Sequence, residues 1–84
     1  MDQKEVTDKI VAILKPFIKN QEALASLGPE TSILKDLKVN SARLVDIVLE
    51  IEEIFGIQVK DEDAEKVRTI GDAVGLVLRQ KAAS

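Results

Sequence analysis

The chain is 84 residues long, which is enough for a single domain, and we place that domain over residues 1–84. It contains no cysteine and no histidine, which excludes disulfides, thiolate or imidazole metal sites and the commonest general base of enzymes. Apart from Met1, Phe17 and Phe55 the apolar residues are aliphatic, and the net charge is −3. The composition therefore favours a small domain with a deformable core and gives no sign of an enzyme.

Charge is distributed unevenly along the chain. Residues 40–65 contain eight acidic side chains against two basic ones, whereas residues 1–39 contain six of each. An acidic middle repels the phosphate backbone of nucleic acids and attracts proteins that carry basic patches. We therefore expect protein partners and no binding of nucleic acid.

The apolar runs of the sequence are compared with those of signal peptides and membrane spans to predict the location of the protein. The N-terminus lacks the basic and then apolar run of a signal peptide, and no apolar run approaches the length of a membrane span. We expect a cytoplasmic protein that does not insert into membranes.

The first predicted element is an amphipathic helix over residues 3–15. Its apolar residues recur at spacings of three and four, which is the period of a helix with one buried face. Pro16 lies within this pattern and should end or kink the helix, because proline lacks the amide hydrogen that a helical turn requires. The apolar positions are Val6, Ile10, Ile13, Leu14, Phe17 and Ile18.

A long connection is expected over residues 20–40. Gly28-Pro29 is its clearest break, since this pair of residues favours a turn. The alanine-rich piece Gln21–Leu27 is compatible with one helical turn inside the connection.

The second helix is expected over residues 41–55. Either Asn40 or Ser41 can cap its start by accepting a hydrogen bond from a backbone amide, and Gly56 supplies the stop. Its residues separate into three lines along the helix. The core line is Leu44, Ile47, Val48, Ile51 and Phe55, the polar line is Arg43, Asp46, Glu50 and Glu53, and a second apolar line is Ala42, Val45 and Leu49.

Two further helices complete the chain. Asp61 is expected to cap a short helix over residues 61–67, and Thr69-x-x-Asp72 has the pattern of a capping box before a helix over residues 70–80. The periodicities together predict an all-α, monomeric four-helix bundle, with three main helices, one short helix and a long loop between the first two. The apolar stripe of the last helix is Ile70, Ala73, Val74, Val77 and Leu78.

Two places in the chain suggest chemistry. The acidic run 61–65 lacks the glycine that a calcium loop needs at its sixth position, which is Lys66, so we expect a solvated helix start and no metal site. Ser41 suits covalent attachment, because a hydroxyl at a helix start is accessible and a helix N-terminus favours an anionic phosphodiester. The alternative is a plain capping serine, which capping statistics alone favour.

The order of short motifs from Ser32 to Ala73 resembles the acyl carrier protein family. The stretch begins Ser-Ile-Leu-Lys-Asp-Leu-Lys-Val-Asn-Ser-Ala, continues through an acidic helix to Phe-Gly-Ile and an acidic turn, and ends Thr-Ile-Gly-Asp-Ala. The family pattern has Asp-Leu-Gly, Asp-Ser-Leu, Phe-Gly-Ile and Thr-hydrophobic-Gly-Asp-Ala in the same order. Four motifs in succession make this a specific resemblance.

The resemblance implies a carrier, with Ser41 matching the serine that receives covalent 4′-phosphopantetheine. The arm would supply the missing thiol and hold acyl groups as thioesters. The implied partners are a phosphopantetheinyl transferase and acyl-loading, acyl-transfer or synthase enzymes with basic patches, in fatty-acid, lipid, lipopolysaccharide or polyketide pathways. Residues implied in partner binding are Ala42, Arg43, Val45, Asp46, Leu49, Glu50 and Glu53, and Glu52 lies on the same acidic helix. Residues implied in lining a space for the acyl chain are Leu44, Val48, Ile51, Val74 and Val77.

The sequence departs from the family pattern at the implied attachment site. Asn40-Ser41-Ala42 replaces Asp-Ser-Leu, Lys38 replaces the usual glycine, and Arg43 places a cation at the head of the acidic face. These differences favour a specialised pathway over bulk fatty-acid synthesis. They leave a second interpretation open, in which the domain is never loaded and serves as a carrier-like helical module that binds a protein partner.

Overall fold

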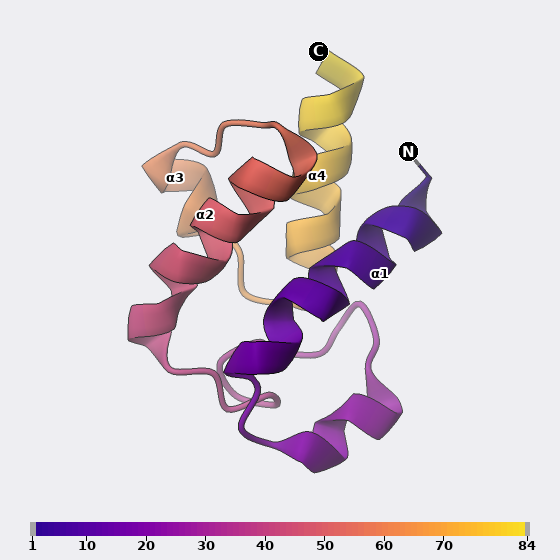
Figure 1. Ribbon diagram of the computed structural model, residues 1–84, viewed down its shortest axis with the longest axis vertical. Helices are drawn as coiled ribbons and strands as arrows, with labels where there is room; N and C mark the ends of the chain where they lie inside the picture. Colours follow the sequence, from indigo (N-terminus) through magenta and orange to yellow (C-terminus); the bar gives the residue numbers. More distant parts are fainter. Residues whose placement is uncertain (1, 84) are drawn as a thin grey trace.

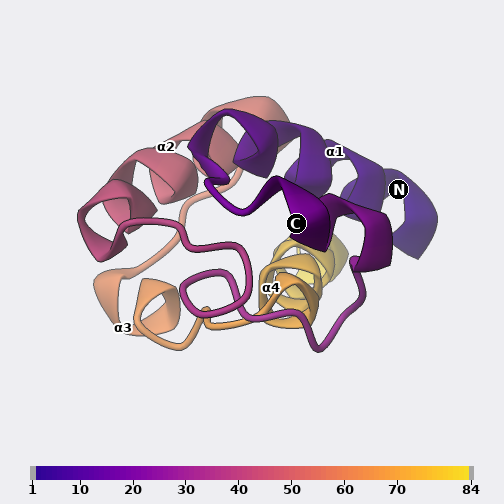
Figure 2. The same cartoon turned by 90° about the horizontal axis from the view of Figure 1, so that it is seen from below.

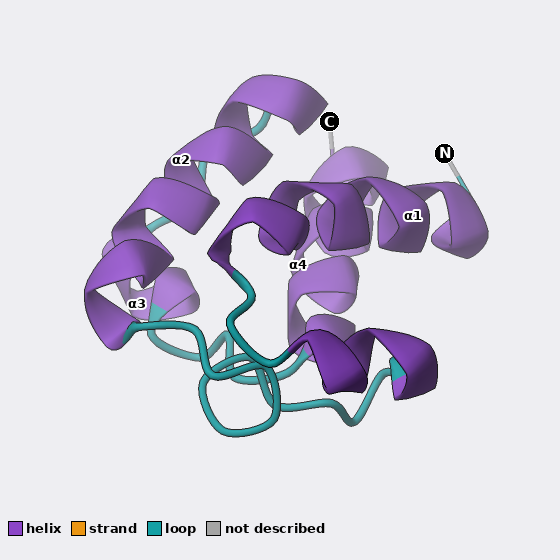
Figure 3. Ribbon diagram, turned by 60° about the horizontal axis from the view of Figure 1, so that its bottom comes forward, coloured by secondary structure: helices purple, strands orange, loops and turns teal. Residues whose placement is uncertain are grey.

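The computed structural model describes residues 2–83, apart from the side chains of Gln21, Leu24 and Ala83, and shows an all-helical bundle (Figure 1). α1 packs against both α4 and α2. Within the described residues there is no strand (Figure 3). A single antiparallel bridge in this part of the chain joins Ser32 to Thr69. The all-α prediction is confirmed. The helices are α1 (Gln3–Leu14), α2 (Leu44–Phe55), α3 (Asp61–Ala64) and α4 (Ile70–Ala83).

α1 ends where the proline requires it to end. The carboxylate of Asp2 accepts a hydrogen bond from the Glu5 amide (2.8 Å) and caps the start of the helix. The last α-helical residue is Leu14, and a 3-10 turn over Lys15–Phe17 follows, with Pro16 inside it. Proline thus ends the α-helix and tightens the chain into a narrower turn.

α2 stops at Gly56, as predicted. This glycine has a φ of 65°, in the left-handed region that residues with a side chain disfavour. Beyond it, the backbone amide of Val59 donates to a carboxylate oxygen of Glu52 (2.9 Å), which ties the connection after α2 back to the helix. Glu52 therefore has a structural task inside the domain.

α3 is shorter than predicted and begins differently. It spans Asp61–Ala64, whereas the sequence suggested residues 61–67 with Asp61 as the cap. Lys60 is the capping residue instead, its side chain makes no capping bond, and its carbonyl accepts from the amides of Asp63 (3.0 Å) and Ala64 (2.9 Å). No residue of α3 is buried, so no apolar packing holds further turns in place.

α4 begins with the predicted capping box. The Asp72 amide donates to the Thr69 hydroxyl, while the Asp72 carboxylate accepts from the amides of Thr69 and Arg68, each at 3.1 Å. Slight burial of this carboxyl works to raise its pKa, but these hydrogen bonds and the charge of Arg68 outweigh it, so the pKa of Asp72 lies below its usual value. The helix runs to Ala83, three residues beyond the predicted end.

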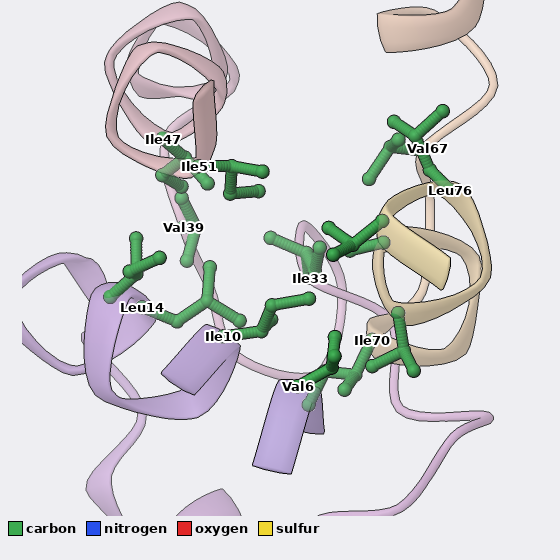
Figure 4. Close-up of a cluster of buried hydrophobic side chains, with 14 of the residues drawn as sticks. Val6, Ile10, Leu14, Ile33, Val39, Ile47, Ile51, Val67, Ile70 and Leu76 are labelled. Carbon is green, nitrogen blue, oxygen red and sulfur yellow. The ribbon is translucent and has the colours of Figure 1, made fainter. Parts of the chain in front are cut away.

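The connection between α1 and α2 is part of the core. It includes a 3-10 segment over Gln21–Ser26, which agrees with the helical turn suggested for that piece, and it then crosses the lower end of the bundle (Figure 2). Ile33, Leu37 and Val39 from this connection are only 0–4 % exposed. Figure 4 shows Ile33 among side chains from α1 and α4, and Val39 beside Leu14 and Ile47.

Backbone hydrogen bonds hold this connection against the start of α4. The amide of Ile33 donates to the Arg68 carbonyl (3.0 Å), and the amide of Ile70 donates to the Thr31 carbonyl (3.1 Å). The amide of Gly71 donates to the Pro29 carbonyl (2.9 Å). Segments that are distant in sequence thus share a short ladder around the Ser32–Thr69 bridge.

The predicted apolar faces are largely buried. Phe17 and Leu78 are half-buried members of otherwise buried stripes on the first and last helices. On α2, Ile47, Ile51 and Phe55 are buried, while Leu44 and Val48 are only half-buried. Leu76 is buried as well, so α4 is covered over more of its circumference than the sequence pattern predicted.

The Asp72 cap should contribute a measurable, pH-dependent share of stability. Asp72→Asn should lower the free energy of unfolding by about 0.3–1 kcal/mol near pH 7, because an amide oxygen accepts weaker hydrogen bonds than a carboxylate and brings no negative charge to the helix N-terminus. Because folding lowers this pKa, the difference from wild type should be present above the ordinary value of 3.8 and should shrink as pH falls through the folded-state value. Urea unfolding near pH 7 and about pH 3 measures both effects. Asp8→Asn, an exposed carboxyl on α1, is the control, and an equal loss in both variants would contradict the assignment.

Candidate functional site

Ser41 stands at the start of the helix that the sequence singled out. It opens a 3-10 turn, Ser41–Arg43, that continues directly into α2. The cap is Asn40, whose side-chain oxygen accepts a hydrogen bond from the Ala42 amide (2.9 Å). Of the two capping candidates, Asn40 takes the role, and Ser41 is left without a structural task at the helix start.

The environment of Ser41 fits a covalently attached anionic group. The residue is exposed, and among residues 2–83 nothing bonds to its hydroxyl. The partial positive charge of the helix N-terminus favours a phosphodiester there. An accessible hydroxyl at a helix start is therefore a suitable position for a phosphate-linked arm.

The residues before Ser41 fix its position. Val39 is 4 % exposed and Leu37 is fully buried, so the chain is anchored in the core just before the helix begins. Between these two anchors lies Lys38, with a φ of 58°. A side chain in this left-handed region strains the backbone, which explains why glycine suits the position better.

The second apolar line of α2 faces outward. Val45 is 64 % and Leu49 57 % exposed, and Ala42 at the head of the same line is exposed too. Two large aliphatic side chains one helical turn apart form a small apolar patch beside Ser41. Ile54, 48 % exposed, lies further along α2 and was not anticipated, because the sequence assigned it to no line.

The acidic residues of α2 differ in their partners. Arg43 forms an ion pair with Asp46 (3.2 Å), which neutralises the first carboxylate of the face from within the same helix. Glu50 and Glu53 are exposed. Glu52 is occupied by the Val59 amide, so it does not belong with the exposed carboxylates. The outward negative charge of α2 is thus concentrated on Glu50 and Glu53.

The residues predicted to line an acyl-chain space lie partly together. Ile51, Val74 and Val77 belong to the buried core, Leu44 packs against it, and Val48 is half-buried on α2. Val74 also borders an apolar hollow of about 320 Å³ between α1, residues 27–29 and α4. The apolar pattern of the sequence does not predict this hollow, although Gly71 and Gly75, one turn apart on α4, are a signal for it.

Comparison with known proteins agrees with this geometry. The family model described as "Phosphopantetheine attachment site" matches residues 8–77. An acyl carrier protein from Rubrobacter xylanophilus is 36 % identical over 83 residues, covering 99 % of this chain and 100 % of that protein. The chain belongs to the acyl carrier protein family. A second acyl carrier protein, from Thermosynechococcus vestitus, is 31 % identical over 83 residues, which cover 99 % of this chain and 100 % of that protein.

Solved structures support the same fold. An acyl carrier protein from Enterococcus faecalis superposes with a TM-score of 0.79 at 31 % identity, covering 95 % of this chain and 99 % of that chain. One from Thermotoga maritima also gives 0.79, at 25 % identity, covering 99 % and 94 %. As a member of this family the chain is a carrier protein, not a catalyst, of the kind that holds acyl groups on covalent 4′-phosphopantetheine. No helix within residues 2–83 is long and apolar enough to cross a membrane.

Replacing Lys38 should reveal the strain before the site. Lys38→Gly should raise the free energy of unfolding by about 0.5–1 kcal/mol, because glycine adopts a φ of 58° without steric conflict. Lys35→Gly, at an exposed position outside the left-handed region, is the matched control and should destabilise. Urea unfolding of both variants measures the effect, and a lower midpoint for Lys38→Gly would show that Lys38 is not strained.

Proposed function

We propose that Ser41 carries the 4′-phosphopantetheine arm and that the protein presents acyl thioesters to the enzymes of a specialised acyl-transfer pathway. The observation that supports this most is the exposed, unbonded Ser41 hydroxyl at a helix start that Asn40 already caps. The arm would bring the thiol that a chain without cysteine lacks. The residues of the chain itself would orient the arm, favour its phosphodiester charge and recognise partner enzymes.

Asn40 keeps one part of the usual aspartate's role and loses another. Asparagine and aspartate cap helices about equally well, so the helix start forms with either residue. The carboxylate charge, however, is absent from Asn40. A loading enzyme that uses this charge to assemble its metal-dependent transfer complex would therefore find the helix start in place but no carboxylate beside Ser41.

The outward face of α2 is proposed to be the partner surface. Val45 and Leu49 offer apolar area, and Glu50 and Glu53 offer charge for a basic patch. Arg43 lies between this charge and Ser41, and its pairing with Asp46 weakens the negative field where partners approach the attachment point. Exposed pairs of this kind add little stability, so we assign Arg43 to partner selection.

The interior beside α2 is proposed to shelter the acyl chain. Leu44 and Val48 lie half-buried on the helix that begins at Ser41, and Ile51, Val74 and Val77 belong to the buried core. All five side chains are aliphatic and can rearrange around a guest chain. Each methylene that enters recovers about 0.8 kcal/mol of hydrophobic free energy.

Loading at Ser41 is tested by mass. The unloaded protein, incubated with coenzyme A and a broad-specificity phosphopantetheinyl transferase, should gain one 4′-phosphopantetheine. Ser41→Ala should stay folded and gain none, because the cap belongs to Asn40. Asn40→Asp should load faster while its stability changes by less than about 1 kcal/mol, since the cap is retained and a negative charge suits the helix N-terminus.

The alternative function is an unloaded carrier-like module, and the same experiment decides between the two. If several transferases leave the mass of wild type and of Asn40→Asp unchanged, the unloaded module is the correct interpretation. If only Asn40→Asp is loaded, the Ser41 site is intact and Asn40 is what prevents loading.

Specialisation is tested by restoring the family residues. The variant Asn40→Asp, Ala42→Leu, Arg43→Asp should serve general fatty-acid synthesis enzymes better than wild type does, measured as kcat/KM of the acyl-transfer step with loaded protein. Leu at 42 returns an apolar contact of up to about 2 kcal/mol, and loss of Arg43 removes repulsion that should weaken as salt rises. Arg79→Asp, an exposed charge reversal on α4, is the control. Equal service by wild type and the triple variant would exclude a specialised carrier.

A further inference from the structure

The apolar hollow of about 320 Å³ lies away from the attachment site. Its walls come from α1, from residues 27–29 of the connection and from residues 70–78 of α4, and α2 contributes none of its lining residues. Val11, Leu27 and Leu78 are half-buried apolar side chains that face it. The hollow therefore differs from the interior space proposed beside α2, and Val74 is the one proposed lining residue of that space that also borders the hollow.

The hollow exists because a glycine on α4 has no side chain and no neighbouring residue fills the space. Gly71 and Gly75 are four residues apart and so lie on one face of the helix. At Gly71, a Cβ atom would come within 2.8 Å of the Pro29 carbonyl oxygen, so backbone from the connection already fills that place. At Gly75, a Cβ atom would meet nothing within 4 Å.

Several polar groups around the hollow are already hydrogen-bonded within the protein. The Thr7 hydroxyl donates to the Gln3 carbonyl (2.7 Å), and the Gly28 amide donates to the Thr31 hydroxyl (2.9 Å). The Pro29 carbonyl accepts from the Gly71 amide (2.9 Å). A ligand would gain few hydrogen bonds from these groups, so contact with apolar surface decides what binds.

We propose that this hollow binds a free hydrocarbon chain without a covalent bond, such as the tail of a fatty alcohol or fatty acid. A dry apolar cavity of about 150 Å³ is enough to hold benzene, so 320 Å³ leaves room for several methylene groups. Pro29 and Gln3 are exposed where the hollow opens, so a polar head group would stay in water. The site does not depend on the loading of Ser41.

The test uses neutral alcohols and the unloaded full-length protein. Titration with 1-hexanol, 1-octanol and 1-decanol should shift the methyl NMR signals of Val11 and Leu78 in a saturable way. Each added methylene should tighten binding about fourfold until the hollow is full. The Ser41→Ala protein should behave identically, which separates this result from any failure of loading.

A variant whose new side chain fills the hollow gives the decisive test. Gly75→Leu should weaken 1-octanol binding about 15-fold, because the new side chain displaces at least two methylene groups. Ala82→Leu, the same kind of change at an exposed position of α4, should bind like wild type. Gly75→Ala, which adds one methyl group to the same wall, should weaken binding about fourfold and serves if the leucine variant does not fold.

Three outcomes would overturn the proposal. One is the absence of saturable shifts with all three alcohols. Another is equal affinity in wild type and in a folded Gly75 variant. The third is a response confined to Leu44 and Ile51, since the alcohol would then occupy the interior beside α2 and not the hollow.

Discussion

The short ladder of backbone hydrogen bonds between residues 29–33 and the start of α4 is the constraint on which the rest of the domain depends. It joins segments nearly forty residues apart, and it places Ile33 between α1 and α4. Leu37 and Val39 follow Ile33 into the core, and Val39 in turn fixes the point at which α2 begins. The position of Ser41 is thus set through the connection as well as through α2 itself.

The helices could be predicted because their signals are local. Apolar spacing, Pro16, Gly56 and the Thr69–Asp72 pair each act within a few residues, and each was confirmed by the structure. The burial of Ile33, Leu37 and Val39 could not be read in the same way, because an irregular connection has no period. Their burial is decided by partners on α1 and α4. The predicted length of α3 was wrong for a related reason. A capping residue can start a helix, but only packing against the rest of the domain extends a helix this short.

The candidate site combines an intact scaffold with altered charge. Asn40 caps the helix start as an aspartate would, yet brings no carboxylate, and Arg43 pairs with the first acidic residue of α2. Glu52 shows why an acidic helix cannot be read as one uniform surface, since its carboxylate holds the Val59 amide. The sequence pattern predicted Ser41 as the candidate attachment site and grouped Val45 and Leu49 in one line along α2. Which charged residues make contacts within the domain could be seen only from the side chains in the structure.

The small size of α3 has a consequence for how the interior is reached. Its four residues bury nothing and lack a side-chain cap, so the free energy that keeps them folded is small compared with that of α1 and α4. Hydrogen exchange of the amides around residues 61–66 should therefore proceed by local unfolding rather than by opening of the whole domain. Such fluctuations leave the ladder at the start of α4 in place while they loosen the chain between Val59 and the buried Val67. In the proposed function, this local unfolding gives the acyl chain a route into and out of the interior beside α2 that does not require global unfolding.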